Sequence, residues 1–221
     1  DGTGEAAAPA TEQEVNADAQ AAAEAESGAI TFTDDLGRTV ELPAQIDKIC
    51  PSGFTAQQVM LTMAPDKMVG LAQELNDDQL KIFGEKFADY PVFGAVLGAK
   101  DDLNREAVAA AAPQVIIDTG EAKKGAKEDL DALQEQLGIP VIFIEADLPH
   151  MAAAFRTLGS ILEGKAERGE ELAAFVEQTV SMAEENAAKI QDSERLSGLY
   201  TSGSSGLNTD AKGSTQAQVL D

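Results

Sequence analysis

The sequence has few of the residues that build disulfides, metal clusters and catalytic triads. Its 221 residues include one cysteine, one histidine and no tryptophan. Cys50 alone cannot form an intrachain disulfide or a cysteine-based zinc cluster, and we interpret it as a small buried apolar residue. His150 alone cannot build a site from several imidazoles or support a Ser-His-Asp triad, and we interpret it as a surface or helix-capping histidine. We therefore predict no catalytic residues, no metal ligands and no cofactor.

Basic residues and long apolar runs are also scarce. The chain carries 39 acidic against 16 basic residues, a formal net charge of -23. Binding to nucleic acid or to anionic lipid requires a clustered basic surface, so this balance argues against both. The apolar runs are short and broken by charge, well below the roughly 18 consecutive apolar residues of a membrane-spanning helix.

The first 29 residues differ in composition from the rest of the chain. They contain seven acidic residues, no lysine or arginine, and Val15 as their only large aliphatic side chain. Such a segment buries too little apolar surface to offset the entropy lost on ordering, which predicts a disordered acidic tether. A tether of this kind follows the anchor cysteine of a mature surface lipoprotein, although no lipid-attachment cysteine is in this sequence. A disordered tail with no anchoring role is the alternative.

Residues 30–148 alternate between strand-like and helix-like patterns. Alternating apolar residues around Asp35–Gly37 predict a β-hairpin over 30–43. Further strands are predicted at Lys48–Cys50, Met68–Ala72, Val115–Ile117 and Val141–Ile144, separated by helices at Phe54–Met63, Asn104–Ala112 and Glu128–Leu137. Continuous apolar strands separated by helices are typical of an α/β domain, a parallel sheet flanked by helices on both faces.

The pattern changes after residue 148. Apolar residues at helical spacing continue over 149–192, with a weak point at Gly164–Gly169, and predict one long helix. Residues 195–200 again have a strand pattern, followed by a turn-rich segment. A lone strand leaves its backbone groups unpaired. We therefore expect 193–221 to be the truncated start of a second α/β lobe.

Two loops follow predicted strands and precede predicted helices, where parallel α/β sheets bind ligands. One is Pro51–Thr55, which offers hydroxyl and backbone N–H groups at the head of a helix. The other is Thr119–Lys124, which with Gly125 approaches a phosphate-binding loop. Ala126 stands where that motif needs lysine, which argues against an NTPase. Ordinary β-to-α turns would have a similar composition.

The order of these segments resembles the periplasmic-binding-protein class that serves siderophore, haem and cobalamin ABC importers. The resemblance is carried by the hairpin Thr33–Pro43, the unit Ile49–Gly53 with Asp66–Gly70, the pair Leu103–Ala107 with Ala112–Asp118, and Gly138–Val141 ahead of the long helix. It implies an extracytoplasmic, non-catalytic substrate-binding protein with two lobes joined by one rigid helix. The implied partners are an ABC permease and a metal chelate (siderophore or haem) or corrinoid (cobalamin-like) ligand, with membrane attachment only through a lipid anchor.

The resemblance also implies which residues of the first lobe contact the ligand. They are Ser52, Gly53, Phe54, Thr55, Gly94, Val96, Leu97, Thr119, Gly120, Glu121 and Lys123. Phe54 would offer an apolar face to a macrocycle or chelate, and Lys123 would attract an anionic complex. Glu128 is near the position at which the family's acidic surface residue meets basic residues of the permease. The alternatives are a surface protein-interaction or sensor module with the same fold, and an intracellular α/β enzyme whose cofactor motif is missing from the sequence.

Overall fold

The fold is an α/β domain with one long helix of 22 residues near its C-terminal end. The computed structural model describes residues 28–95, 103–195, 201, 204–206 and 208–209. The predicted tether, apart from its last two residues, and the predicted strand at 195–200, apart from its first residue, lie outside these ranges. No helix among the described residues combines the length and apolarity needed to cross a membrane.

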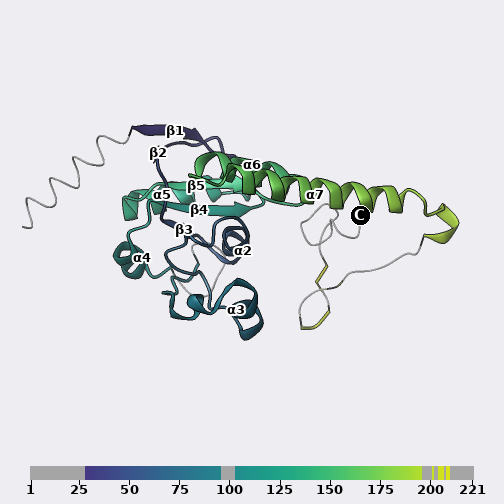
Figure 1. The fold of residues 1–221 in the computed structure, drawn as a ribbon, viewed down its shortest axis with the longest axis horizontal. Helices are drawn as coiled ribbons and strands as arrows, with labels where there is room; N and C mark the ends of the chain where they lie inside the picture. The colour runs from purple at the N-terminus through teal and green to yellow at the C-terminus, as the bar shows by residue number, and fades with distance from the viewer. Residues whose placement is uncertain (1–27, 96–102, 196–200, 202–203, 207, 210–221) are drawn as a thin grey trace, which may run out of the picture.

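The chain opens with the predicted β-hairpin, formed by β1 (Ala29–Thr33) and β2 (Thr39–Pro43) in antiparallel register. Its turn is held by Asp34, whose carboxylate accepts hydrogen bonds from the N–H groups of Leu36 (3.1 Å) and Arg38 (2.9 Å). The buried guanidinium of Arg38 ion-pairs with Asp34 and donates to the carbonyl oxygen of Val141 at 2.8 Å. These contacts fix the hairpin to the sheet, which lies below it in Figure 1.

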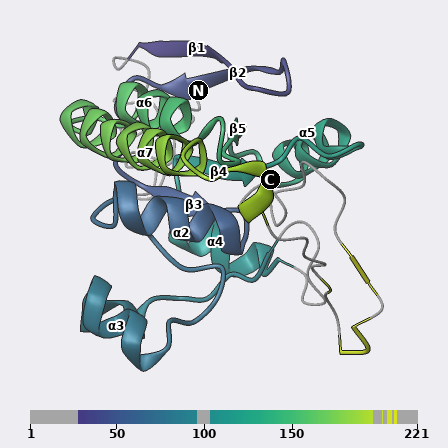
Figure 2. The same ribbon diagram turned by 90° about the vertical axis from the view of Figure 1, so that its right-hand side faces the viewer.

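The sheet consists of three strands in the order β3-β4-β5. They are parallel, as the apolar strand pattern predicted. They are β3 (Ile49–Pro51), β4 (Val115–Gly120) and β5 (Val141–Glu145). One face packs against α2 (Phe54–Met63), α6 (Met151–Ile161) and α7 (Ala166–Ala187), and the other against α4 (Arg105–Ala111) and α5 (Ala126–Leu137). Figure 2 shows the hairpin as an outer layer next to α6. Apolar residues are therefore buried on both faces of the sheet.

The predicted strand at Met68–Ala72 is wrong. The segment forms only two isolated bridges, Ile49 with Met68 and Leu71 with Val92, because it changes partner along its length. The change occurs around Gly70, where an added Cβ would lie 2.2 Å from the ring of Phe93. Two short helices without a sequence prediction follow, α3 (Asp77–Phe83) and η1 (Glu85–Asp89).

The single helix predicted over 149–192 is also wrong, because the structure has α6 and α7 in its place, followed by the short η2 (Asp192–Glu194). Gly164, at φ +72°, lies in the turn between the two helices. The chain then turns back along α6, and a Cβ at Gly169 would lie 2.5 Å from the carbonyl oxygen of Phe155. This close approach requires glycine and allows the two helices to pack against each other.

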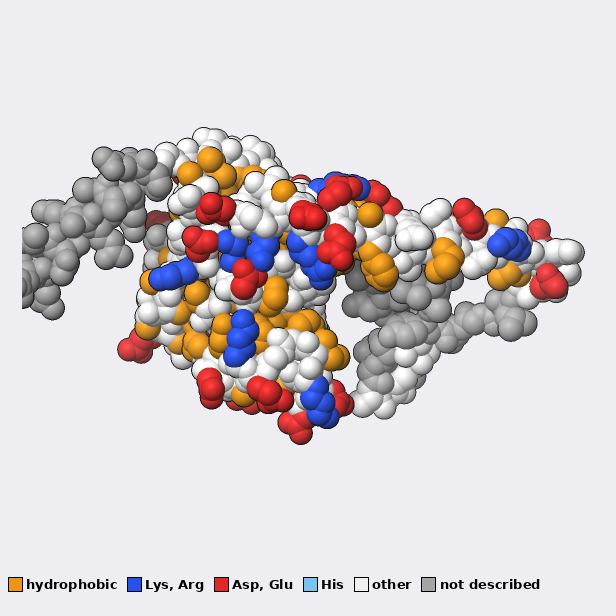
Figure 3. Space-filling view, viewed as in Figure 1, with side chains coloured by type: hydrophobic (Ala, Val, Ile, Leu, Met, Phe, Trp, Pro, Cys, Tyr) orange, Lys and Arg blue, Asp and Glu red, His pale blue; other side chains and the backbone are white. Residues whose placement is uncertain are grey.

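The second half of α7 does not pack against the rest of the domain. The side chains of Phe175 and Met182 are 66% and 57% exposed, and every residue from 181 to the end of the helix is exposed. In Figure 3 this part of α7 projects from the domain with apolar side chains along it.

Candidate ligand-binding site at the carboxyl edge of the sheet

A cavity of about 230 Å³ lies where β3 and β4 end. The two strands are parallel neighbours, so the turn from β3 into α2 and the turn from β4 into α5 meet at the same edge. Residues of both turns line it, together with Ala56, Asp118, Ala126, Phe143 and Ala146. The edge is the one at which parallel α/β sheets bind ligands.

The first side of the cavity is the beginning of α2. Its N-cap, Gly53, provides no side-chain hydrogen bond to the first turn. The first N–H groups of a helix have no intrahelical partner and carry partial positive charge. Gly53, Phe54, Thr55 and Ala56 all line the cavity. This turn is suited to bind oxygen atoms, charged or neutral.

Ser52 and Asp118 join the two turns. The Ser52 N–H donates to the carbonyl oxygen of Ile117 at 3.0 Å, and the Ser52 hydroxyl donates to the Asp118 carboxylate. Burial raises the pKa of the Asp118 carboxyl, and the hydrogen bond from Ser52 opposes that rise. The pair fixes the floor of the cavity.

Thr119 and Gly120 form the second side. Thr119 is 6% exposed, and its hydroxyl has no hydrogen-bond partner among the described residues. A buried hydroxyl without a partner costs roughly 1–3 kcal/mol, so it is a feature that a bound ligand would relieve. Gly120 has φ +144°, a backbone conformation that favours glycine.

Phe54, Glu121 and Lys123 complete the lining with one apolar and two charged side chains. The Phe54 side chain is 52% exposed although it is a large aromatic residue. The Lys123 ammonium acts on Asp118 through its charge. The cavity therefore offers hydrogen-bond donors, an apolar surface and both signs of charge to a bound molecule.

A sequence model of the family described as "Periplasmic binding protein" matches residues 61–207, more than half of the chain. The chain belongs to the periplasmic binding protein family. This family is a class of substrate-binding, non-catalytic proteins. A search of curated proteins finds no match.

Solved structures of periplasmic binding proteins share the fold. An ABC transporter solute binding protein from Sulfurospirillum deleyianum superposes with a TM-score of 0.72 at 24% identity, covering 86% of this chain and 59% of that one. The molybdate periplasmic binding protein MolA of Haemophilus influenzae has a TM-score of 0.62 at 15% identity, covering 76% and 56%. The TroA-like periplasmic binding protein FepB of Veillonella parvula has a TM-score of 0.56 at 25% identity, covering 74% and 50%. This periplasmic binding protein chain thus spans between half and three-fifths of the length of these structures.

Most of the residues that the sequence analysis assigned to ligand binding lie together in the cavity. They are Ser52, Gly53, Phe54, Thr55, Thr119, Gly120, Glu121 and Lys123. Gly94 lines a neighbouring, more open cavity of about 610 Å³ with Ala72, Phe93 and Asn104. Val96 and Leu97 lie outside the described residues. Glu128 is exposed on the first turn of α5 and does not line the cavity.

Sequence reasoning missed Asp118 and a second polar group at the end of β5. Asp118 was left out of the predicted binding residues although it directly precedes Thr119, and it lies within β4, which continues to Gly120 instead of ending at Ile117. The second group consists of Glu145, Asp147 and His150, whose ligand atoms lie within 4.8 Å of one another. Its only signal in the sequence is the position of two acids and the single histidine just after a buried strand.

Proposed function

We propose that this protein is the substrate-binding component of an ABC importer and that it carries an iron complex (siderophore or haem) or a cobalamin-like ligand outside the cytoplasm. The observation that carries the proposal is the cavity where the uncapped N-terminus of α2, the exposed ring of Phe54 and the hydroxyl of Thr119, which has no partner among the described residues, come together. Membership in the periplasmic binding protein family supports the importer assignment.

Each part of the cavity has a role in this proposal. The N–H groups of α2 and the Thr119 hydroxyl donate hydrogen bonds to oxygen atoms on the outside of the ligand. Phe54 packs against an apolar ring or chelate surface. Lys123 attracts a ligand with net negative charge, which would otherwise be repelled by a chain of charge -23.

In the complete binding site a second lobe closes over the ligand. We propose that 30–148 form the first lobe, that the helical segment within 149–192 connects the lobes, and that 193–221 begin the second. A cavity of about 230 Å³ covers only part of a ligand of this size, which supports a second lobe, since drug-sized ligands usually occupy sites of roughly 300–1,000 Å³.

The remaining parts of the proposal concern location and transport. Residues 1–29 act as a tether to a lipid anchor, so that the protein stays at the outer surface of the membrane or in the periplasm. Glu128, exposed on α5, meets a basic residue of the permease. No part of this role requires catalysis.

The proposal is tested by titrating the chain with ferric siderophores, haem, cobalamin and molybdate while following thermal unfolding. Molybdate is included because a protein of the same fold, MolA, binds it. A ligand that binds only the folded chain raises the melting temperature according to its affinity. An increase with one chelate or corrinoid supports the proposal and identifies the ligand. An increase with molybdate alone contradicts the assigned ligand class but keeps the substrate-binding role. If no compound raises the melting temperature, the assigned ligand class is contradicted and the interaction-module alternative is favoured.

Phe54→Ala tests whether the bound ligand occupies the cavity. We expect the dissociation constant to rise about tenfold, equivalent to ~1.4 kcal/mol, because the ligand loses an apolar contact. Phe175→Ala is the matched control, since Phe175 is also an exposed phenylalanine and lies on α7, away from the cavity lining. Equal affinities for the two variants would contradict the placement of the ligand.

A further inference from the structure

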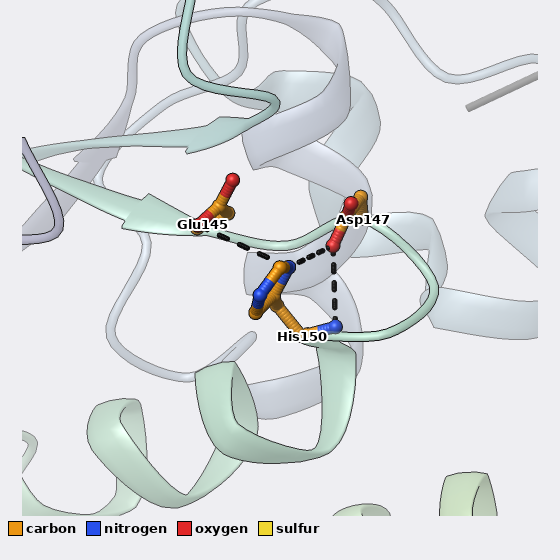
Figure 4. A group of neighbouring side chains, drawn as sticks. All are labelled: Glu145, Asp147 and His150. Carbon is orange, nitrogen blue, oxygen red and sulfur yellow. Dashed lines mark hydrogen bonds and ion pairs between the residues drawn. The ribbon is translucent and has the colours of Figure 1, made fainter. Parts of the chain in front are cut away.

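Three side chains with metal-ligand atoms meet where β5 turns into α6. Glu145 is the last residue of β5, Asp147 lies in the turn and His150 is the N-cap of α6. Nδ1 of His150 faces both acids, in contact with Oδ1 of Asp147 and 3.9 Å from Oε2 of Glu145 (Figure 4). The three ligand atoms lie within 4.8 Å of one another.

This spacing is close to that of a single metal site. Nitrogen and carboxylate oxygen ligands lie about 2.0–2.2 Å from zinc, so two ligands of one ion are at most roughly 4.4 Å apart. The Glu145 and His150 side chains are 31% and 50% exposed, so they have room to rotate towards that geometry. The same exposure gives an ion access from solvent.

The backbone holds the three residues in place without the ion. The N–H of Glu145 donates to Oδ2 of Asp35 at 2.7 Å, and the N–H of Ala146 donates to the carbonyl oxygen of Gly120 at 3.0 Å. The N–H of His150 donates to the backbone carbonyl oxygen of Asp147 at 3.1 Å. A preformed arrangement of ligands loses less entropy when it binds an ion.

The local charge also favours a cation. Asp35 places a third carboxylate beside this group, and its charge acts on His150. Within the described part of the chain, neither Asp35 nor Glu145 is ion-paired with a lysine or arginine. A divalent ion would compensate this negative charge.

We propose that Glu145, Asp147 and His150 bind a divalent transition-metal cation, with Zn²⁺ bound more tightly than Mn²⁺ and with Ca²⁺ bound weakly. One imidazole nitrogen and two carboxylates form a mixed site, and affinities of such sites rise from manganese towards zinc. Calcium and magnesium prefer sites made only of oxygen ligands. The remaining coordination positions are open to water.

The site is separate from the proposed ligand cavity. None of its three residues lines that cavity, although Ala146 between two of them does. Because the ligands span the end of β5 and the start of α6, a bound ion cross-links the sheet to the helix and stabilises the folded chain. Metal binding at this site and ligand binding in the cavity can therefore be tested independently.

The test is isothermal titration of the tag-free 221-residue chain with Zn²⁺, Mn²⁺, Ca²⁺ and Mg²⁺ in buffer with high potassium chloride. High salt screens the weak attraction of all cations to an acidic chain. We expect one zinc ion per chain, with at least about tenfold weaker binding in both His150→Ala and Glu145→Gln, since each loses one ligand. Glu106→Gln, which changes an exposed acid on α4, is the matched control and keeps the affinity of the parent chain.

Thermal unfolding gives a second measurement on the same proteins. Zinc should raise the melting temperature of the parent chain and of Glu106→Gln but not that of His150→Ala. Circular dichroism establishes that each variant is folded, and Glu145→Gln provides an independent test if His150→Ala is not. Unchanged zinc affinity in either site variant that folds would overturn the proposal, as would equal binding of zinc and magnesium.

Discussion

The two parts of the sheet's carboxyl edge have opposite chemistry. At the ends of β3 and β4 the chain presents hydrogen-bond donors, namely the uncapped first turn of α2 and the hydroxyl of Thr119. At the end of β5 it presents acceptors, the carboxylates of Glu145 and Asp147 and the imidazole of His150. The parallel topology brings both groups to one edge, while the residues of each turn decide whether it suits an oxygen-rich ligand or a cation. One edge can therefore carry two independent sites.

The two parts also differ in how their polar groups are satisfied. At the end of β5, Asp147 and His150 are hydrogen-bonded to each other. At the end of β4, a buried hydroxyl has no partner in the described chain and burial raises the pKa of Asp118. Unsatisfied buried groups reduce stability, and proteins keep them mainly at functional sites, which supports the proposal that the β3–β4 part binds the ligand.

The largest expected effect is a loss of folding stability at Gly120, with Gly53, the other glycine of the cavity, as the comparison. Gly120→Ala should lower the free energy of unfolding by about 1–3 kcal/mol, because alanine is strained at φ +144°. Gly53→Ala should change it by less than about 0.5 kcal/mol, because Gly53 is extended at φ -175° and its added Cβ would only touch Ala95 at 3.6 Å. Urea denaturation of both variants measures the difference. Equal losses of unfolding free energy in the two variants would contradict the assignment of backbone strain to Gly120.

A smaller effect of opposite sign is expected at Thr119. Thr119→Val should raise the free energy of unfolding by about 1 kcal/mol, because valine keeps the shape and removes the unpaired hydroxyl. The same change should weaken ligand binding, which makes stability and function move in opposite directions. Thr55→Val, at an exposed position in the same cavity, is the control for stability. A destabilised Thr119→Val chain would mean that the hydroxyl has a partner in solution.

The smallest expected effect is a change in how folding stability depends on pH, caused by the carboxyl group of Asp118. Since the folded-state pKa is raised above the ordinary value of 3.8, the stabilising contribution of the neutral carboxyl is fully present below that value and is lost as pH rises through the folded-state pKa. Asp118→Asn removes this dependence. Relative to the parent chain, its melting temperature should therefore increase from pH 3.5 to pH 7. A constant difference across this range would show that burial does not control the ionisation of Asp118.

The sequence predicted those elements whose signals are local. Alternation around Asp35–Gly37 specified the hairpin. The helix predicted from Asn104 is α4, and Asn104 caps it by accepting a hydrogen bond from the N–H of Ala107 at 3.0 Å. The two loops of the cavity followed from strand–helix order alone, since parallel topology brings strand ends to one edge.

Features that depend on tertiary contacts were not predictable in this way. Helical periodicity continues across the turn at Gly164, and only the contact of Gly169 with α6 reveals a reversal of the chain. The strand expected at Met68–Ala72 was lost because the segment bridges two neighbours in turn. The acids of the β5 end could not be singled out among 39 in the sequence until the fold placed them beside His150.

The most direct test of the ligand-binding claim is amide NMR on the ¹⁵N-labelled chain, with the compound from the panel that most raises the melting temperature. The account predicts that the largest shifts, or the loss of signal by paramagnetic broadening if the compound is ferric, occur at the amides of Gly53–Ala56 and Thr119–Glu121, with much smaller effects at Glu145 and His150. Shifts concentrated on α7 or at the end of β5, with no change at the two β-to-α turns, would contradict it.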